Sequence, residues 1–363
     1  MQEEKLSYKK VGVDVEKEDL GLEKLKKWTE KTFSLREKQG SVKLKIGYFA
    51  NIIDIGFDKG LAISTDGVGT KILIAQLMGK YDTVGIDCVA MNVNDILCVG
   101  AEPISMVDYL AVASPEHELL EQIGKGLYEG AKAARINIPG GEIAQVREMI
   151  KGEKRGYEFD LVGTAVGLVE LDKIIIGKGI KEKDVIVGFA SSGLHSNGFT
   201  LARKVLLEKA KLKVETYIPD LGRTLGEELL EPTLIYVAPV IEMIEKGINI
   251  KALIHITGGG LLNLTRVATP VTCILDNLPA PLPVFSLIQK TGNIPPEEMF
   301  SVFNMGIGFC VIVAEEEMED VIEIGKKHKF KTFRIGYIGK IGERKVIIPS
   351  YRLAGRGNNF AKY

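Results

Sequence analysis

Leu61-Ala-Ile-Ser-Thr-Asp-Gly-Val-Gly-Thr-Lys71 is a strand-like apolar segment that passes through a glycine-rich turn and leads into the apolar helical run Ile72 to Met78. A second strand-like run, Leu161-Val-Gly-Thr-Ala-Val, lies further along the chain, and helical patterns such as His117 to Ala134 lie between the two. Strands that alternate with amphipathic helices from Ile46 to about Val169 predict a mixed α/β domain.

The second half of the chain also alternates strands with helices. Glu170 to Lys183 is short, charged and contains glycine, and the new strand Val185-Ile-Val-Gly-Phe-Ala follows it. We therefore place a domain boundary near residue 172, which divides the chain into residues 1–172, 173–345 and a polar tail, 346–363. Within the tail, Ser350 to Tyr363 is expected to be loosely ordered. Near the start, Leu20 to Leu35 has apolar residues at helical spacing and predicts an amphipathic helix with Trp28 in the core.

Composition indicates an ordinary globular protein. The 363 residues are enough for two domains, and with 45% hydrophobic and 26% charged residues no apolar run approaches the ~20 residues of a membrane span. The start of the chain has no apolar segment typical of a secretory signal, so the cytoplasm is the expected location. A net charge of -1 without a basic block argues against nucleic acid as a partner. The four cysteines form no CxxC pair and are expected to be buried thiols.

Four glycine-rich segments could cradle phosphate, although neither GxxxxGK[ST] nor a strand-linked GxGxxG occurs. In the first, Asp66 would supply a carboxylate to Mg²⁺, Gly67 and Gly69 would let the backbone approach phosphate, and Lys71 would add a positive charge. The alternative is an Asp-Gly turn with a solvated lysine.

The second segment is the helix from Gly85 to Gly100. At 100° per residue, Asp87, Asn94 and Asp95 share a stripe about 80 to 100° wide. Carboxylates buried on such a helix need a cation or hydrogen bonds, so the stripe favours a metal; the alternative is a polar face that meets water. Glu142, after Ile138-Pro-Gly-Gly, would be a further carboxylate on a tight turn.

The third and fourth segments combine polar side chains with glycine. Ser191-Ser-Gly-Leu-His-Ser-Asn-Gly198 precedes a helix and is rich in donors for an anion, with His195 in reach of chemistry; a capped turn is the alternative. His255-Ile-Thr-Gly-Gly-Gly260 is followed later by the related turn Phe303-Asn-Met-Gly-Ile-Gly308. Each of these two is weak evidence alone, and His255 could equally be a near-core histidine.

Seven motifs, in this order, resemble the signature series of the phosphoribosylformylglycinamidine cyclo-ligase (aminoimidazole ribonucleotide synthetase) family. They are TDGVGTK, the GIDxVAMxVND helix, GGE, SSGxHSNG, LLEPTxIY (Leu229 to Tyr236), HxTGGG and FNxGxG. The resemblance covers roughly residues 8 to 340, and it includes the opening Val11-Gly-Val-Asp14 after Tyr8.

The resemblance implies a two-domain α/β (α+β) fold of the aminoimidazole-ribonucleotide-synthetase type, with a mixed C-terminal sheet and an active cleft between the domains. It also implies a homodimer in which the N-terminal sheets pair into a barrel. The family converts formylglycinamidine ribonucleotide and MgATP to aminoimidazole ribonucleotide, ADP and phosphate in purine biosynthesis. The formamide oxygen is phosphorylated, the amidine nitrogen attacks that carbon, and phosphate leaves.

Matching positions one by one, the resemblance implies a metal held by Asp66, Asp95 and Glu142. The implied catalytic residues are Asp95, Lys71 and, as an acid or base, His195. The implied ATP and phosphate contacts are Asp66, Gly67, Gly69, Thr70, Lys71, Ser192, Ser196, Asn197, Thr257, Gly258, Gly259 and Gly260.

Two departures from the family pattern concern the binding loops. Ile46-Gly-Tyr-Phe-Ala-Asn replaces a GGFGG-type loop, and Gln145 follows GGE where the frequent form GGETAEMP carries a second glutamate. The basic insertion Lys151 to Tyr157 has no assigned role.

Rival functions are a selenophosphate synthetase, a hydrogenase-maturation protein, another ATP-dependent kinase of the superfamily and a non-catalytic nucleotide-binding paralogue. The first would need a reactive Cys near its N-terminal glycine-rich loop and the second a C-terminal Cys, whereas the first cysteine here is Cys88 and the chain ends in Tyr363. The intact Asp66, Lys71 and Asp95 argue against the paralogue.

Overall fold

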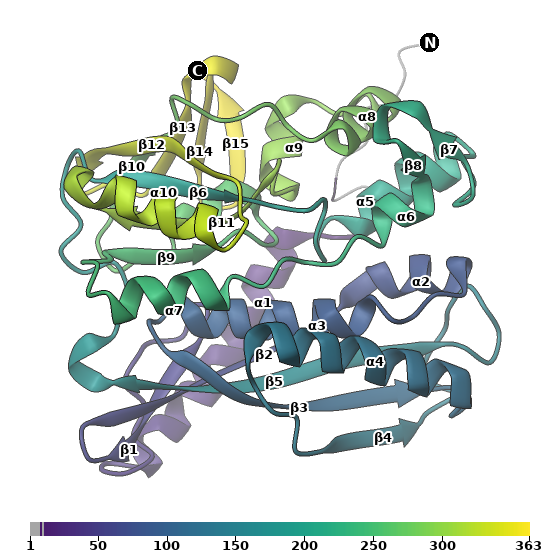
Figure 1. The fold of residues 1–363 in the computed structure, drawn as a ribbon, viewed down its shortest axis with the longest axis horizontal. Helices are drawn as coiled ribbons and strands as arrows, with labels where there is room; N and C mark the ends of the chain where they lie inside the picture. Colours follow the sequence, from purple (N-terminus) through teal and green to yellow (C-terminus); the bar gives the residue numbers. More distant parts are fainter. Residues whose placement is uncertain (1–7, 9–10) are drawn as a thin grey trace.

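The computed structural model describes Tyr8 and residues 11–363, which form two sheets with helices packed between them (Figure 1). The N-terminal sheet has the order β1-β2-β5-β3-β4. Its strands are β1 (Asn51–Gly56), β2 (Lys59–Gly67), β3 (Glu102–Val112), β4 (Gly141–Gln145) and β5 (Phe159–Glu170). Burial alternates along β2 and β5 because one face is covered by α3 (Val84–Leu97) and α4 (His117–Ala134).

The C-terminal sheet has eight strands in the order β15-β14-β13-β10-β12-β6-β11-β9. Their bounds are β6 (Val185–Ala190), β9 (Ala252–His255), β10 (Val271–Ile274), β11 (Ile307–Val313), β12 (Thr332–Ile341), β13 (Lys345–Ile348), β14 (Leu353–Arg356) and β15 (Asn359–Lys362). Every residue of β11 is buried, which agrees with its continuous apolar sequence and indicates cover on both faces.

The remaining helices pack around these sheets. They are α2 (Ile72–Met78), α5 (Phe199–Arg203), α6 (Leu225–Leu229), α7 (Val237–Glu245), α8 (Pro283–Gly292), α9 (Pro296–Val302) and α10 (Met318–Lys327). A π-helical turn, Lys204–Lys209, continues α5. Two short strands, β7 (Tyr217–Ile218) and β8 (Arg223–Thr224), form a separate ribbon.

Two expectations about the ends of the chain are wrong. The polar tail is ordered as β14 and β15, which extend the sheet and bury Leu353 and Phe360 against it. The N-terminal helix exists, as α1 (Val15–Thr29) followed by a 3₁₀ turn, but Trp28 is 67% exposed and its ring contacts Lys31 instead of the core. The helical spacing of apolar residues thus predicted the helix. The described residues of the chain do not cover its apolar side chains.

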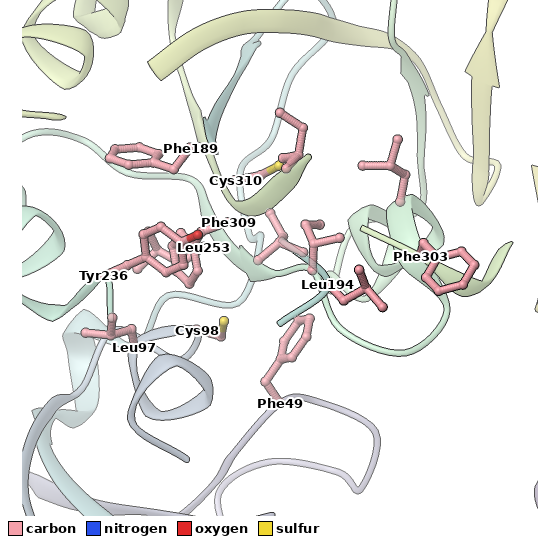
Figure 2. Packing of buried hydrophobic residues seen from close by; sticks show 14 of the residues in the cluster. Phe49, Leu97, Cys98, Phe189, Leu194, Tyr236, Leu253, Phe303, Phe309 and Cys310 are labelled. Atoms are coloured by element: carbon pink, nitrogen blue, oxygen red, sulfur yellow. The ribbon is translucent and has the colours of Figure 1, made fainter. Parts of the chain in front are cut away.

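The core runs continuously from one domain into the other. Figure 2 shows Leu97 and Cys98, at the end of α3, facing Tyr236 and Phe309 of the C-terminal domain. All four cysteines are buried and free, as expected. Among the helices of the described residues, none is long and apolar enough to cross a membrane.

Candidate active site

The polar stripe of α3 faces the C-terminal domain. Asp87 accepts hydrogen bonds from the backbone N–H and the hydroxyl of Thr233, at 2.7 and 2.6 Å. Asn94 donates to the Leu234 carbonyl and accepts from the Tyr236 N–H, at 2.9 and 3.0 Å. Asp87 and Asn94 are therefore neither solvated nor free to bind a metal, and they join α3 to the LLEPTxIY segment.

Lys71 is the cation that compensates Asp87. Its ammonium is fully buried, lies 2.9 and 2.8 Å from the two Asp87 oxygens, and donates to the Glu231 carbonyl at 2.6 Å. Burial lowers the pKa of Lys71, while the Asp87 carboxylate opposes that shift. This placement does not fit the phosphate contact or the catalytic role expected from TDGVGTK, because the ammonium has no exposed surface with which to meet a ligand. Lys71 instead positions the domains.

Asp66 and Asp95 are the carboxylates that remain available. The pKa of Asp66 is raised to about 6, chiefly by burial and then by the negative charge of Asp95. Asp95 bonds the Nδ1 atom of His255 at 2.8 Å, so one of its oxygens is oriented from the other domain. Among the described residues, the structure records no lysine or arginine ion pair to either carboxylate. Two neighbouring carboxylates that are bonded only by the Gly67 N–H and by His255 among the described residues form a suitable place for a cation.

Glu142 is not brought to this pair. Across the sheet, Asp66 lies in register with Gly163, Gly163 with Asp108, and Asp108 with Gly141. Gly163 faces α3, since a Cβ there would meet Asn92 and Cys88, so Asp66 faces α3 as well. Glu142, one residue beyond Gly141, has its side chain on the other face of the sheet and is exposed. Within the described residues no group of three His, Cys, Asp or Glu side chains is placed to hold a metal, so this chain does not assemble the expected three-carboxylate set.

The three phosphate-type loops come together at the seam between the domains. The Thr70 and Thr200 hydroxyls are 3.3 Å apart, and a Cβ on Gly69 would lie 3.9 Å from the Ser196 carbonyl. A Cβ on Gly258 would lie 3.3 Å from the Asn197 side-chain oxygen. Gly69, Thr70 and Gly258 are exposed there, while Gly67, Ser192, Ser196, Asn197, Thr257 and Gly259 are partly exposed and Gly260 is buried. Two hydroxyls of the third segment are already engaged, Ser192 with the Pro232 carbonyl at 2.5 Å and Ser196 with Thr233 at 3.3 Å.

His195 is buried beside these loops. Burial, followed by the positive charges of His255 and Lys71, holds the pKa of His195 well below its usual range, so its imidazole is neutral. The Nε2 atom accepts from the Ser192 N–H at 3.3 Å, which leaves the proton on Nδ1, and Nδ1 is buried without a partner. The geometry allows His195 to donate a hydrogen bond from Nδ1, and its role as acid or base stays a prediction.

Buried asparagines that sequence reasoning did not select hold the site segments. Asn92 bonds both the N–H and the carbonyl of Asp66, at 2.9 and 3.0 Å. Asn263 donates to the Gly258 and Gly260 carbonyls, at 3.1 and 2.9 Å. The usable signal is an amide among apolar neighbours, as in Ala90-Met-Asn-Val and Leu261-Leu-Asn-Leu, because a buried amide needs bonding partners.

Of the segments that depart from the family pattern, the Ile46 to Asn51 loop and the Lys151 to Tyr157 insertion are held by contacts between the domains, whereas Gln145 is not. Arg266 bonds the Tyr48 carbonyl at 3.2 Å and stacks on the Phe49 ring at 4.0 Å, so the Ile46 to Asn51 segment is packed. In the Lys151 to Tyr157 insertion, Glu153 pairs with Arg203 at 2.6 Å, and its N–H donates to Gln76 at 2.6 Å. Gln145 lies exposed on the edge strand β4.

Comparison with known proteins identifies the family of the chain. The family descriptions "AIR synthase related protein, N-terminal domain" and "C-terminal domain" match residues 48–169 and 181–348. A phosphoribosylformylglycinamidine cyclo-ligase of Methanocaldococcus jannaschii is 51% identical over 92% of both chains. One of Pyrococcus furiosus is 45% identical over 95% of this chain and 98% of its own. Thiamine monophosphate kinase from Aquifex aeolicus, at 18% identity, shares the fold over 92% of this chain and 97% of its own, with a TM-score of 0.60. The chain belongs to the AIR synthase family.

Proposed function

We propose that this chain is an ATP-dependent cyclo-ligase that closes the imidazole ring of formylglycinamidine ribonucleotide to give aminoimidazole ribonucleotide, ADP and phosphate. The observation that carries the proposal is identity of 45 to 51% to relatives of that name over more than nine-tenths of the chain. The convergence of TDGVGTK, SSGLHSNG and HITGGG at one seam supports it, because the chemistry needs phosphate-binding backbone and carboxylates together.

The reaction needs an activated oxygen. The formamide oxygen attacks the γ-phosphorus of ATP, and ADP leaves. The amidine nitrogen then forms a bond to the formamide carbon, and the bond between this carbon and the phosphorylated oxygen breaks to release phosphate. Phosphorylation turns a poor leaving oxygen into a good one. The protein's part is to hold both reactants in line and to exclude water at a seam that already buries His195 and His255.

Asp66 and Asp95 fit a magnesium ion. Mg²⁺ commonly binds one or two protein carboxylates together with substrate phosphates and water, so two carboxylates suffice when the nucleotide supplies the rest. Burial and the negative charge of Asp95 raise the pKa of Asp66, and a cation beside both carboxylates would lower it again. Such an ion neutralises charge on the transferred phosphoryl group. His255 would fix the orientation of the Asp95 carboxylate, and Asn92 would fix the backbone of Asp66.

The exposed loop residues would meet the nucleotide and the substrate phosphate. Backbone N–H groups at Gly69, Gly258 and Gly259 can approach phosphate because these residues carry no Cβ, whereas the N–H groups of Gly67 and Gly260 already donate to Asp66 and to the Thr257 carbonyl. Thr70, Asn197 and Thr257 would add side-chain bonds, with Ser192 and Ser196 available if they release their present partners.

The chain would act as a homodimer through its N-terminal sheet. The face away from α3 carries apolar side chains that stay exposed or half-buried in the single chain, and Tyr109 of β3 is 45% exposed. These side chains are Leu61 and Ile63 on β2, Val107 and Tyr109 on β3, and Val162, Val166 and Leu168 on β5. A contiguous apolar sheet face of this kind marks an interface, and a second copy of the same sheet would cover it.

The test is direct. Purified protein is incubated with formylglycinamidine ribonucleotide and MgATP, and aminoimidazole ribonucleotide is followed colorimetrically alongside phosphate release. We expect both products in equal amounts and dependence on Mg²⁺. If neither aminoimidazole ribonucleotide nor phosphate is formed, the proposal is wrong. Phosphate release without ring closure would indicate a different phosphoryl acceptor.

A further inference from the structure

The Phe303-Asn-Met-Gly-Ile-Gly308 turn packs against the loop that carries His195. Its Asn304 side chain is 3% exposed and makes four hydrogen bonds. The Nδ2 atom donates to the Gly193 and Leu194 carbonyls at 2.9 and 3.2 Å. The Oδ1 atom accepts from the Ser191 hydroxyl at 3.0 Å and from the Gly306 N–H at 2.8 Å. One amide therefore uses its full bonding capacity, mostly on the residues before His195.

The rest of the turn follows the shape of the same loop. The Ser191 N–H donates to the Gly306 carbonyl at 2.9 Å. A Cβ on Gly198 would lie 2.3 Å from the Phe303 ring, and a Cβ on Gly308 would lie 2.5 Å from Cε1 of His195. Figure 2 shows Phe303 and Leu194 on neighbouring segments of the chain. Side chains at Gly198 or Gly308 would therefore clash with Phe303 or His195, so the turn and the loop fit closely against each other.

The loop needs such support because His195 has a strained backbone. Its φ of 62° lies in the left-handed region, which disfavours residues with a Cβ by about 1 to 3 kcal/mol. A conformation of this kind persists only where neighbouring groups determine it. The carbonyls of Gly193 and Leu194, which Asn304 holds, directly precede this residue.

We propose that Asn304 is a positioning residue for the cyclo-ligase reaction: its amide locks residues 191–195 into the conformation that fixes the buried His195 and presents the partly exposed Ser196 and Asn197 to the substrates. Asn304 itself touches no substrate. The inference rests on the proposed function for its kinetic readout, although the conformation of the loop can be measured without any reaction.

The test variant is Asn304→Asp, which keeps the size of the side chain but sets an oxygen against the two carbonyls. Two controls accompany it. Asn277→Asp makes the same exchange where an exposed amide bonds the Arg334 carbonyl, and Val346→Ala destabilises the same domain from β13. For all four proteins, kcat and KM for both substrates, the midpoint of thermal unfolding and hydrogen exchange of the peptide covering 191–198 are measured.

For Asn304→Asp we expect kcat/KM to fall about tenfold or more, with faster exchange in 191–198, because two buried bonds are replaced by repulsion. The ratio of variant to wild-type kcat/KM should rise as the pH falls, since a protonated carboxyl can donate to one carbonyl again. Asn277→Asp should resemble the wild type, and Val346→Ala should lose stability without losing kcat/KM.

Three results separate the explanations. If kcat/KM and exchange both stay within twofold of the wild type, the inference is overturned. If Val346→Ala loses kcat/KM as much as Asn304→Asp does, Asn304 is merely structural and the inference is also overturned. If the wild type makes no aminoimidazole ribonucleotide, the proposed function fails. In that case hydrogen exchange alone decides the inference: faster exchange of residues 191–198 in Asn304→Asp supports it, and unchanged exchange overturns it.

Discussion

The two faces of the N-terminal sheet differ in the exceptions they carry to the usual distribution of polarity. The face under α3 is packed with buried apolar side chains and also carries Asp66 of β2, while the buried Lys71–Asp87 pair lies beyond it, where α3 meets the C-terminal domain. The opposite face leaves Val107 and Tyr109 in solvent. Exposed apolar and buried charged groups are the informative exceptions to the burial rule. The first face contributes to the domain contact and to the candidate active site, and the second is the proposed interface with a second copy of the chain.

The two faces also differ in how their cost is offset. Around α3, the buried Lys71–Asp87 pair combines opposite charges with several hydrogen bonds, whereas Asp66 and Asp95 repel each other and meet no lysine or arginine among the described residues. On the open face, the exposed apolar side chains are not covered by other described residues of the chain. The exceptions on the covered face therefore locate the site for a cation, and those on the open face locate the interface for a second copy.

The largest effect should come from breaking the buried pair. Lys71→Met leaves Asp87 without its counter-charge and should lower the free energy of unfolding by about 3 to 5 kcal/mol, measured by urea titration. The double variant with Asp87→Leu should recover part of the loss. If Lys71 contacts phosphate instead, Lys71→Met would raise KM for ATP while leaving unfolding unchanged, and the positioning role would be refuted.

Next in size is Asp95→Asn, which keeps an acceptor for His255 but removes the negative charge. Turnover should fall roughly a hundredfold, equivalent to about 3 kcal/mol of transition-state stabilisation, while the unfolding midpoint stays close to that of the wild type. The matched variant Asp320→Asn, at an exposed carboxylate of α10 in the C-terminal domain, should keep full activity. Unchanged kcat in Asp95→Asn would remove Asp95 from the metal site.

Asp66→Asn should trade activity for stability. The native pKa of Asp66 is raised from 3.8 to about 6, so the unfolded chain releases this proton first and the charge costs stability as the pH rises from about 4 to about 6. The difference between the two pKa values corresponds to about 3 kcal/mol. In the presence of a chelator, the variant should be more stable than the wild type at pH 8 by up to that amount and about equal at pH 4. A constant difference across this range would show that Asp66 is not buried as a charge.

The sequence predicted those features that depend on local pattern. The helices His117–Ala134 and Ile72–Met78 follow from apolar sequence patterns, and the structure has both with the expected bounds. The ordered tail was missed because β14 pairs with β13 and β15 with β14, and because β15 packs on α9, a contact with a distant segment that composition does not reveal. Trp28 was misplaced because amphipathic spacing says that a face will be covered but does not say by which chain.

Within the site, the residue types were predictable but their assignments were not. The α3 stripe was correctly recognised as unusual, yet only the fold shows that Asp87 and Asn94 bond the LLEPTxIY segment while Asp95 bonds His255. Lys71 resembled a phosphate ligand because TDGVGTK places a lysine after glycines, and its burial depends on Asp87, sixteen residues away. Partners from distant segments decide which polar groups remain free for a ligand.

The smallest effect on the fold should come from the open face. Tyr109→Lys places a charge on an exposed position of β3, where surface substitutions change the free energy of unfolding by about 0.5 kcal/mol or less. In the proposed dimer the same change would bury an unpaired charge at the interface, so the protein should shift from dimer to monomer in sedimentation velocity. Tyr128→Lys on α4 makes the same exchange at a tyrosine that is also exposed, but on the other side of the sheet. This variant should sediment as a dimer, like the wild type. A stable dimer in Tyr109→Lys, or equal dissociation in both variants, would mean that the apolar face of the sheet is covered by something other than a second copy.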